Sequence, residues 1–124
     1  MSQLFILTQL KKQLVLFFDE LIDILPQEAD LIIIRIFIKD KFPTEDIMKY
    51  IIAKLVPLKQ MIIQKDEGFF LENNILFEQV DSKKVNRFKC LWRSETLEND
   101  DREMLWKWFY SFVYLAEKYI KLGE

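Results

Sequence analysis

The sequence predicts an all-α fold, a compact single-domain bundle of five or six helices that ends in a long aromatic helix. The 124-residue chain contains only two glycines, too few for the many tight turns of a β-sandwich or barrel. Its abundant leucine, isoleucine, lysine and glutamate favour helices. Apolar residues also recur at three- and four-residue steps, which is the spacing of one helix face. The length, with no linker or repeat, predicts one domain over residues 1–124.

The first predicted helix begins after Ser2, a favourable N-cap residue, and ends before Pro26. Its main apolar stripe comprises Leu4, Leu7, Leu10, Leu14, Phe17, Phe18, Leu21 and Leu25. Further apolar residues widen the stripe beyond one face, namely Phe5, Ile6, Val15, Leu16 and Ile22. We therefore expect this helix to be buried on two sides within the chain or to pack against a second molecule.

Residues 28–42 form the second predicted element, and two structures are open for its central part. Residues 31–38 are rich in β-branched isoleucine, which is typical of a strand. No second convincing strand is available to pair with it, and an isolated strand is unstable. The acidic start at Glu28 and Asp30 suits the first turn of a helix. A helix is therefore the favoured prediction.

Pro43 and Thr44 mark the next helix start, with Thr44 near the N-cap. Pro57 interrupts the apolar period that follows, which predicts either two helices or one kinked helix. A turn is expected at residues 65–68 and an irregular segment at residues 69–82.

The C-terminal third is expected to hold two helices joined by a link at residues 94–99. The first is short, runs over residues 85–93 and carries Phe88, Leu91 and Trp92. Asp100 is the predicted N-cap of the second, with Glu103 at the spacing of a capping box, and this helix runs to about Leu122. Gly123 is the candidate C-cap residue.

The last helix is unusually aromatic over residues 104–120. One face forms a predicted core stripe of Leu105, Trp108, Phe109, Phe112, Leu115, Ala116 and Tyr119, and Lys107, Ser111, Lys118 and Lys121 mark the solvent face. Between these faces lie the candidate protein-interface residues Trp106, Tyr110, Val113 and Tyr114. Residues 69–82 can cover part of this rim, or the rim can bind a protein partner. Base stacking is disfavoured, because Glu117 lies beside the rim.

A basic block precedes this helix and consists of Lys83, Lys84, Arg87, Lys89 and Arg93. A mostly acidic block follows directly at residues 95–103. Three interpretations remain open: solvated helix ends that neutralise one another, contact with nucleic acid or phosphate, and head-to-tail self-association. The neighbouring acids weaken the second, because they repel phosphates.

Catalytic chemistry has little support in this sequence. There is no histidine, which removes the usual general base and the commonest metal ligand. Cys90, the single cysteine, is expected to be a buried and inert thiol. No glycine-rich loop is present to hold a nucleotide phosphate. We therefore expect no enzyme, cofactor or metal site.

The compartment follows from the cysteine count and the N-terminus. One cysteine cannot form an intrachain disulfide, so an intracellular location is expected. The first lysines, Lys11 and Lys12, follow the first apolar stretch, and no small-residue cleavage site comes after it, which argues against a signal peptide. No uncharged run is long enough to span a bilayer.

Residues 76–119 contain two short hydrophobic motifs on either side of an acidic helix start. Phe88-Lys89-Cys90-Leu91-Trp92 precedes an acidic helix start, and Leu105-Trp106-Lys107-Trp108-Phe109 follows it. This arrangement resembles a C-terminal pattern in an uncharacterised protein family of nucleocytoplasmic large DNA viruses (giant viruses). Leu25-Pro26-Gln27-Glu28 is similar to the proline motif that ends the N-terminal helix of that family. The resemblance implies a viral protein in the infected host cell cytoplasm or the virion, and it brings no catalytic residue.

Together these features predict a non-enzymatic interaction or structural protein that acts through helical apolar surfaces. A virion component, an assembly adaptor and a host-factor binder all fit, with a partner that is either a second copy or another protein. The alternative is a small nucleic-acid-binding accessory protein that uses the basic block.

Overall fold

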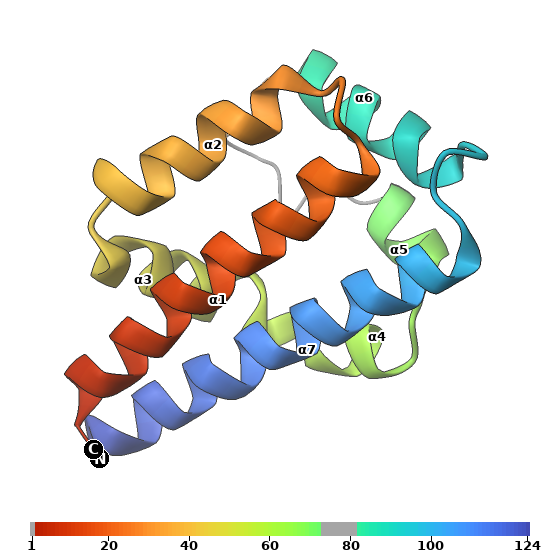
Figure 1. Cartoon of the computed structure of the whole chain (residues 1–124). Helices are drawn as coiled ribbons and strands as arrows, with labels where there is room; N and C mark the ends of the chain where they lie inside the picture. The colour runs from red at the N-terminus through yellow and green to blue at the C-terminus, as the bar shows by residue number, and fades with distance from the viewer. Residues whose placement is uncertain (1, 73–81) are drawn as a thin grey trace.

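A computed structural model describes residues 2–72 and 82–124, and these residues confirm the all-α fold (Figure 1). Residues 31–38 lie inside a helix, so the strand alternative is wrong. In chain order the elements are α1 (Gln3–Ile24), α2 (Ala29–Asp40), α3 (Thr44–Lys54), the 3-10 helix η1 (Val56–Leu58), α4 (Lys59–Ile63), α5 (Glu67–Glu72), α6 (Ser82–Arg93) and α7 (Asn99–Leu122).

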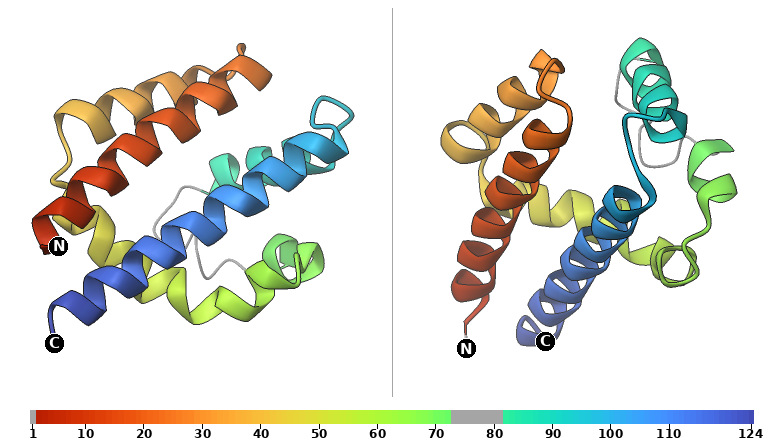
Figure 2. Two further views of the ribbon diagram at one scale, coloured as in Figure 1. Left: turned by 60° about the horizontal axis from the view of Figure 1, so that its bottom comes forward. Right: turned by 45° about the vertical axis from the view of Figure 1, so that its right-hand side comes forward.

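The helices α1 and α7 run side by side in opposite directions, and the two chain ends lie close together (Figure 1). Side-chain hydrogen bonds join the pair along its length: Ser111 Oγ donates to Gln13 Oε1 (2.6 Å) and Trp108 Nε1 donates to Glu20 Oε2 (3.0 Å). Ser111 was assigned to the solvent face, and its bond to α1 corrects that prediction. The helix α2 folds back on the side of α1 away from α7 and forms the outer layer on that side (Figure 2).

The core lies where α1 and α7 meet α3 and α4. The buried stripe of α1 is Ile6, Leu10, Leu14, Phe17 and Leu21. The predicted stripe was right from Leu10 onward, but Leu4 is exposed because Ile6 takes the inward position at the start of the helix. Phe17 is the aromatic centre of this core, since its ring meets Phe112 edge-on at 5.4 Å and Trp108 at 5.9 Å.

Local signals set most of the helix ends. Ser2 Oγ accepts a hydrogen bond from Phe5 N at 3.2 Å, which confirms the predicted N-cap of α1. Gly123 is the C-cap of α7, as predicted. Thr44 is the first residue of α3 rather than its cap, which is Pro43. Pro57 lies in η1, so the chain there changes from α- to 3-10 geometry before α4.

The start of α7 differs from its prediction by two residues. The capping box is formed by Glu98 and Asp101, and Asp101 Oδ2 accepts from Glu98 N at 3.0 Å. Asp100 and Glu103 have the same spacing, so local sequence does not separate the two registers. Leu97 is buried immediately before the cap, and its burial brings the chain into α7 at the earlier position.

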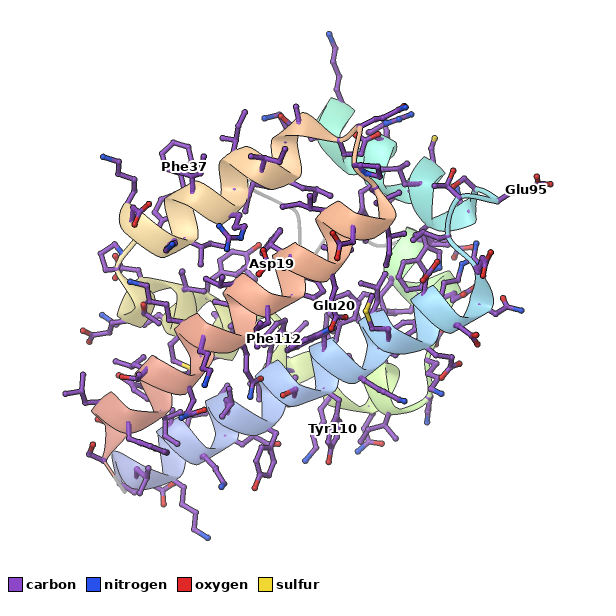
Figure 3. All side chains as sticks on the ribbon, viewed as in Figure 1. Asp19, Glu20, Phe37, Glu95, Tyr110 and Phe112 are labelled. Carbon is purple, nitrogen blue, oxygen red and sulfur yellow. The ribbon has the colours of Figure 1, made fainter. Side chains whose placement is uncertain are left out.

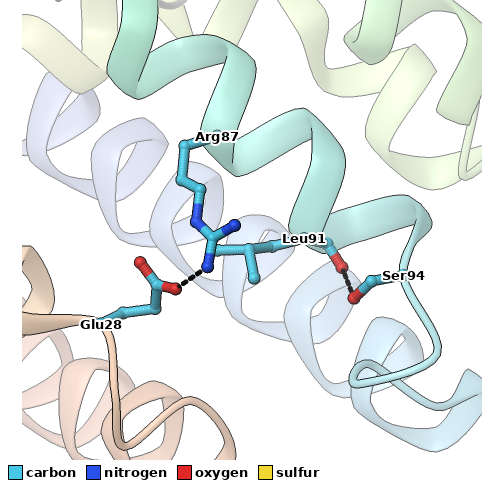
Figure 4. Close-up of polar contacts among 4 residues, drawn as sticks. All are labelled: Glu28, Arg87, Leu91 and Ser94. Atoms are coloured by element: carbon cyan, nitrogen blue, oxygen red, sulfur yellow. Dashed lines mark hydrogen bonds and ion pairs between the residues drawn. The ribbon is translucent and has the colours of Figure 1, made fainter.

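The link between α6 and α7 is held by Arg102, in the first turns of α7. Its Nε donates to Trp92 O at 2.8 Å, and its Nη2 donates to Ser94 O at 3.0 Å. Ser94 Oγ in turn donates to Leu91 O at 2.7 Å (Figure 4). The guanidinium thus satisfies carbonyls at the C-terminal end of α6 that lack a helical partner.

The turn after α4 contains the one described non-glycine residue with positive φ, Lys65 at 54°. Asp66 N bonds Met61 O (3.0 Å) and Lys65 N bonds Ile62 O (3.1 Å), which is a Schellman motif with lysine where glycine is preferred. Gly68, which was assigned to this turn, lies inside α5 instead.

We expect Lys65→Gly to be more stable than Lys65→Ala by about 1 kcal/mol, because alanine keeps the left-handed strain and glycine removes it. Both variants lose the exposed ion pair of Lys65 with Glu103, so the comparison cancels that contribution. Urea unfolding followed by circular dichroism measures the difference. Equal stabilities would show that the turn carries no strain.

Candidate functional site

Two of the four candidate interface residues on α7 are buried within the chain. Trp106 is 4% exposed and Val113 is 0% exposed, so neither can anchor a partner at the surface. The Trp106 ring meets Phe70 of α5 at 5.3 Å and Trp92 of α6 at 5.4 Å. Phe70 belongs to the segment 69–82 that was expected to cover this rim, although residues 69–72 are helical rather than irregular. Residues 73–81 of that segment lie outside the described residues.

The other two candidates, Tyr110 and Tyr114, are 47% and 48% exposed. Tyr110 points away from the bundle on the side of α7 opposite α1 (Figure 3). Lys118 Nζ lies 4.8 Å from the centre of the Tyr114 ring, which is a cation–π contact. The predicted interface on α7 is therefore reduced to two tyrosines one turn apart, beside lysines.

A larger apolar surface lies on α2, where the sequence did not place a site. We name it the α2 face, and its side chains are between 43 and 54% exposed: Ile32, Ile33, Ile36, Phe37 and, just after the helix, Phe42. Phe37 projects outward from α2 (Figure 3), and its ring lies 5.5 Å from that of Phe42. In α2 itself the buried residue is Ile38.

The α2 face is exposed because α2 is covered on one side. Its packing is mainly against α1, where Arg35 Nε bonds Asp19 Oδ1 at 2.6 Å. Ile38 follows Arg35 by three residues and therefore lies on the same side of the helix. The α2 face occupies the opposite half of the circumference. The sequence does carry a signal for this site, because apolar residues occur all round α2. Such a helix is normally covered on every side, so a side left open within the chain indicates a place for a partner.

The basic block on α6 faces acids at the start of α2. Arg87 Nη2 donates to Glu28 Oε1 at 2.5 Å (Figure 4), and Lys84 Nζ lies 3.9 Å from Asp30 Oδ1. The hydrogen bond and the charge of Glu28 raise the pKa of Arg87 above its ordinary value. Arg87 and Lys84 are thus neutralised by acids at the start of α2, and the Arg87–Glu28 bond joins residues 59 positions apart in the chain. Lys83, Lys89 and Arg93 complete the block along the same helix.

A groove of about 460 Å³ lies between α2 and α6. Its floor is apolar, and its mouth carries the ion pairs just described; the lining includes Leu21, Leu25, Leu31, Ile34, Phe88 and Leu91. A second apolar cavity of about 330 Å³ adjoins it and shares Leu21, Leu31, Ile34, Phe88 and Leu105. The side chains that line both spaces suit contact with apolar groups rather than acid–base chemistry.

Cys90 is exposed, so the prediction of a buried thiol was wrong. Phe88 and Trp92, two residues before and after it, turn toward the bundle, and two positions along a helix place a side chain on the other side. Among residues 2–72 and 82–124, no helix has both the length and the apolar composition needed to cross a membrane.

Comparison with family profiles, with characterised proteins and with solved structures yields no match to this chain. A proposal for its function therefore rests on the surfaces of the structure.

Proposed function

We propose that this chain is a non-enzymatic interaction protein that binds a protein partner through the α2 face. The exposure of Ile32, Ile33, Ile36, Phe37 and Phe42 on one side of the molecule carries the proposal. Single exposed apolar residues are ordinary on protein surfaces, whereas contiguous apolar patches mark interaction sites.

The size of the α2 face supports a protein partner. With half of each side chain exposed, the five residues present on the order of 500 Å² of apolar surface, toward the upper end for a monomeric protein. A stable interface buries about 800 Å² on each partner. The α2 face can thus supply the apolar centre of such an interface, with the flanking polar residues as its rim.

The α7 surface is a weaker candidate. Tyr110 and Tyr114 have lysine neighbours and are the exposed remainder of a rim whose other members are buried. Tyrosines at this spacing suit a secondary contact.

Nucleic-acid binding by the basic block remains an alternative prediction. Arg87 and Lys84 each have an acid beside them, and those carboxylates repel phosphates. These acids make the basic block a poorer phosphate site, so protein binding through the α2 face is the better-supported function. The resemblance to a giant-virus family, which implies a virion component, an assembly adaptor or a host-factor binder, remains a prediction compatible with it.

Site-specific photo-crosslinking tests the proposal. Ile33 and, as the matched control, Tyr110 are each replaced by photoreactive benzoylphenylalanine, and cells that produce the chain are irradiated. We expect position 33 to give an adduct of discrete mass with an identifiable protein, and Ile36→Asp in the same chain to abolish it. Position 110 is expected to give at most a weak adduct. No discrete adduct at position 33, or one unaffected by Ile36→Asp, would refute the proposal.

A further inference from the structure

We infer that the exposed side of α7 binds single-stranded nucleic acid, with two tyrosine rings stacking on bases and lysines contacting phosphates. This is a second surface of the molecule, and the inference is independent of the α2 face. We name the surface the α7 stripe. Its members recur at steps of three or four positions and therefore share one side of the helix: Lys107, Tyr110, Tyr114, Lys118 and Lys121.

The two tyrosines of the α7 stripe have the exposure and the spacing that base stacking requires. Tyr110 is 47% exposed and Tyr114 is 48% exposed. One helical turn separates them, which is about 6 Å along the axis. Neighbouring bases stack at about 3.4 Å, so a base between two rings needs about 6.8 Å. The separation of the two tyrosines is close to that value.

Lys118 leaves the space between the rings open. Its Nζ lies 4.8 Å from the centre of the Tyr114 ring. Because Lys118 follows Tyr114 by one turn, it lies on the side of that ring away from Tyr110. The cation–π contact thus holds the Tyr114 ring on one side and places a positive charge next to the stacking position.

The acids nearest to the α7 stripe are neutralised by lysines in and just after α4. Lys59 Nζ lies 3.1 Å from Glu117 Oε1, and Lys65 forms an ion pair with Glu103. The sequence disfavoured base stacking because Glu117 lies beside these aromatic residues. The ion pair with Lys59 removes that objection, since a paired carboxylate repels a phosphate less than a free one does.

The lysines of the α7 stripe keep their positive charge. Within the part of the chain that the structure describes, Lys107, Lys118 and Lys121 form no ion pair. From Lys107 to Lys121 the stripe is about 21 Å long, at about 1.5 Å per residue. At about 3.4 Å per stacked nucleotide, this length spans roughly six nucleotides. Cations along a strand with aromatic rings between them are typical of single-strand binding surfaces.

The composition of the α7 stripe separates this ligand from other anionic partners. A lipid surface is bound by helices whose apolar side chains enter the acyl boundary, and the stripe consists of lysine and tyrosine alone. An acidic protein would pair with the lysines but makes no use of two rings at the spacing of a stacked base. The stripe therefore fits a strand with bases and phosphates best.

Fluorescence anisotropy of a labelled oligothymidine of about 12 nucleotides, twice the expected site, tests the inference on the full chain. At about 50 mM salt we expect a dissociation constant of roughly 1–100 µM, the range of non-specific binding. Tyr110→Ala and Tyr114→Ala should each weaken binding about tenfold. Tyr110→Phe and Tyr114→Phe, the matched controls, keep the ring and should bind like the wild type. Circular dichroism shows that each variant is folded.

The salt dependence tests the lysines. Three phosphate contacts predict that the logarithm of the association constant falls with the logarithm of salt concentration with a slope of about −2. Lys107→Ala should reduce that slope by about 0.7. Arg93→Ala, an exposed cation of the basic block on α6, is the control and should change neither affinity nor slope.

Several results would overturn the inference. One is the absence of binding up to about 500 µM protein, beyond the range of non-specific affinities. Alanine at both tyrosines with unchanged affinity would exclude stacking, as would phenylalanine variants as weak as the alanine ones. A loss on Arg93→Ala but not on Lys107→Ala would assign the binding to the basic block. Binding to phosphatidylserine vesicles and not to the oligonucleotide would assign the stripe to a lipid surface. None of these results depends on the crosslink at position 33.

Discussion

Replacing Trp106 by alanine is expected to lower the free energy of unfolding by about 4 kcal/mol, the largest effect anticipated for a single substitution in this chain. Trp106 joins three elements, since its ring contacts Phe70 of α5, Trp92 of α6 and Phe109 of α7 itself. Removing the ring takes away its buried apolar surface and leaves a cavity between these helices. Urea unfolding followed by circular dichroism measures the loss.

Two controls give this result its meaning. Trp106→Phe retains an aromatic ring and should cost less than half as much. Tyr110→Ala, one turn further along α7, should change stability by no more than about 0.5 kcal/mol, because its side chain is exposed. A Trp106→Ala variant as stable as Tyr110→Ala would contradict the buried position of Trp106. Loss of a partner on Trp106→Ala would reflect unfolding and not a lost contact.

Arg102→Ala is expected to lower the free energy of unfolding by about 2 kcal/mol. The substitution removes the hydrogen bonds to Trp92 O and Ser94 O and leaves those partly buried carbonyls without their donor. Because these bonds tie α6 to α7, the backbone amides of α6 should lose protection against hydrogen exchange before those of α1. Urea unfolding and hydrogen exchange measured by mass spectrometry test the two effects.

Arg102→Lys is the informative control for this prediction. Lysine keeps the charge but lacks the planar fork that reaches both carbonyls and Asn99 Oδ1 (3.3 Å), so it should recover less than half of the loss. Arg93→Ala, an exposed arginine at the end of α6, should have little effect. Full recovery with lysine would show that charge near the α6 C-terminus matters and the fork does not.

Local chemistry was sufficient to predict the helices other than α5, whose residues were assigned to a turn and an irregular segment. Ser2 caps α1, proline residues lie at or near the ends of α1 and α3, and the scarcity of glycine excluded tight-turn folds. The same chemistry was ambiguous where two solutions satisfied it equally. Asp100 with Glu103 and Glu98 with Asp101 have identical spacing, and only the burial of Leu97 selects the second pair.

The candidate site shows what helix periodicity in the sequence could not predict. The isoleucines of α2 and the aromatic rim of α7 are both apolar in the sequence, but only the rim was expected to be covered by residues 69–82 or to bind a partner. Neighbouring helices α5 and α6 cover Trp106, whereas α2 has its principal neighbour, α1, on one side alone. Periodicity shows that a helix face is apolar, but it does not show whether another helix lies against it.

The sequence by itself therefore determined the all-α class, most helix bounds, the core residues of α1 and the lack of histidine-based chemistry. These properties depend on residues within one or two helical turns of each other. The tertiary structure alone decided that Trp106 is core, that Arg87 pairs with Glu28 and that the α2 face is open. Each of these depends on which distant segments meet in space, and that is settled by packing over the whole chain.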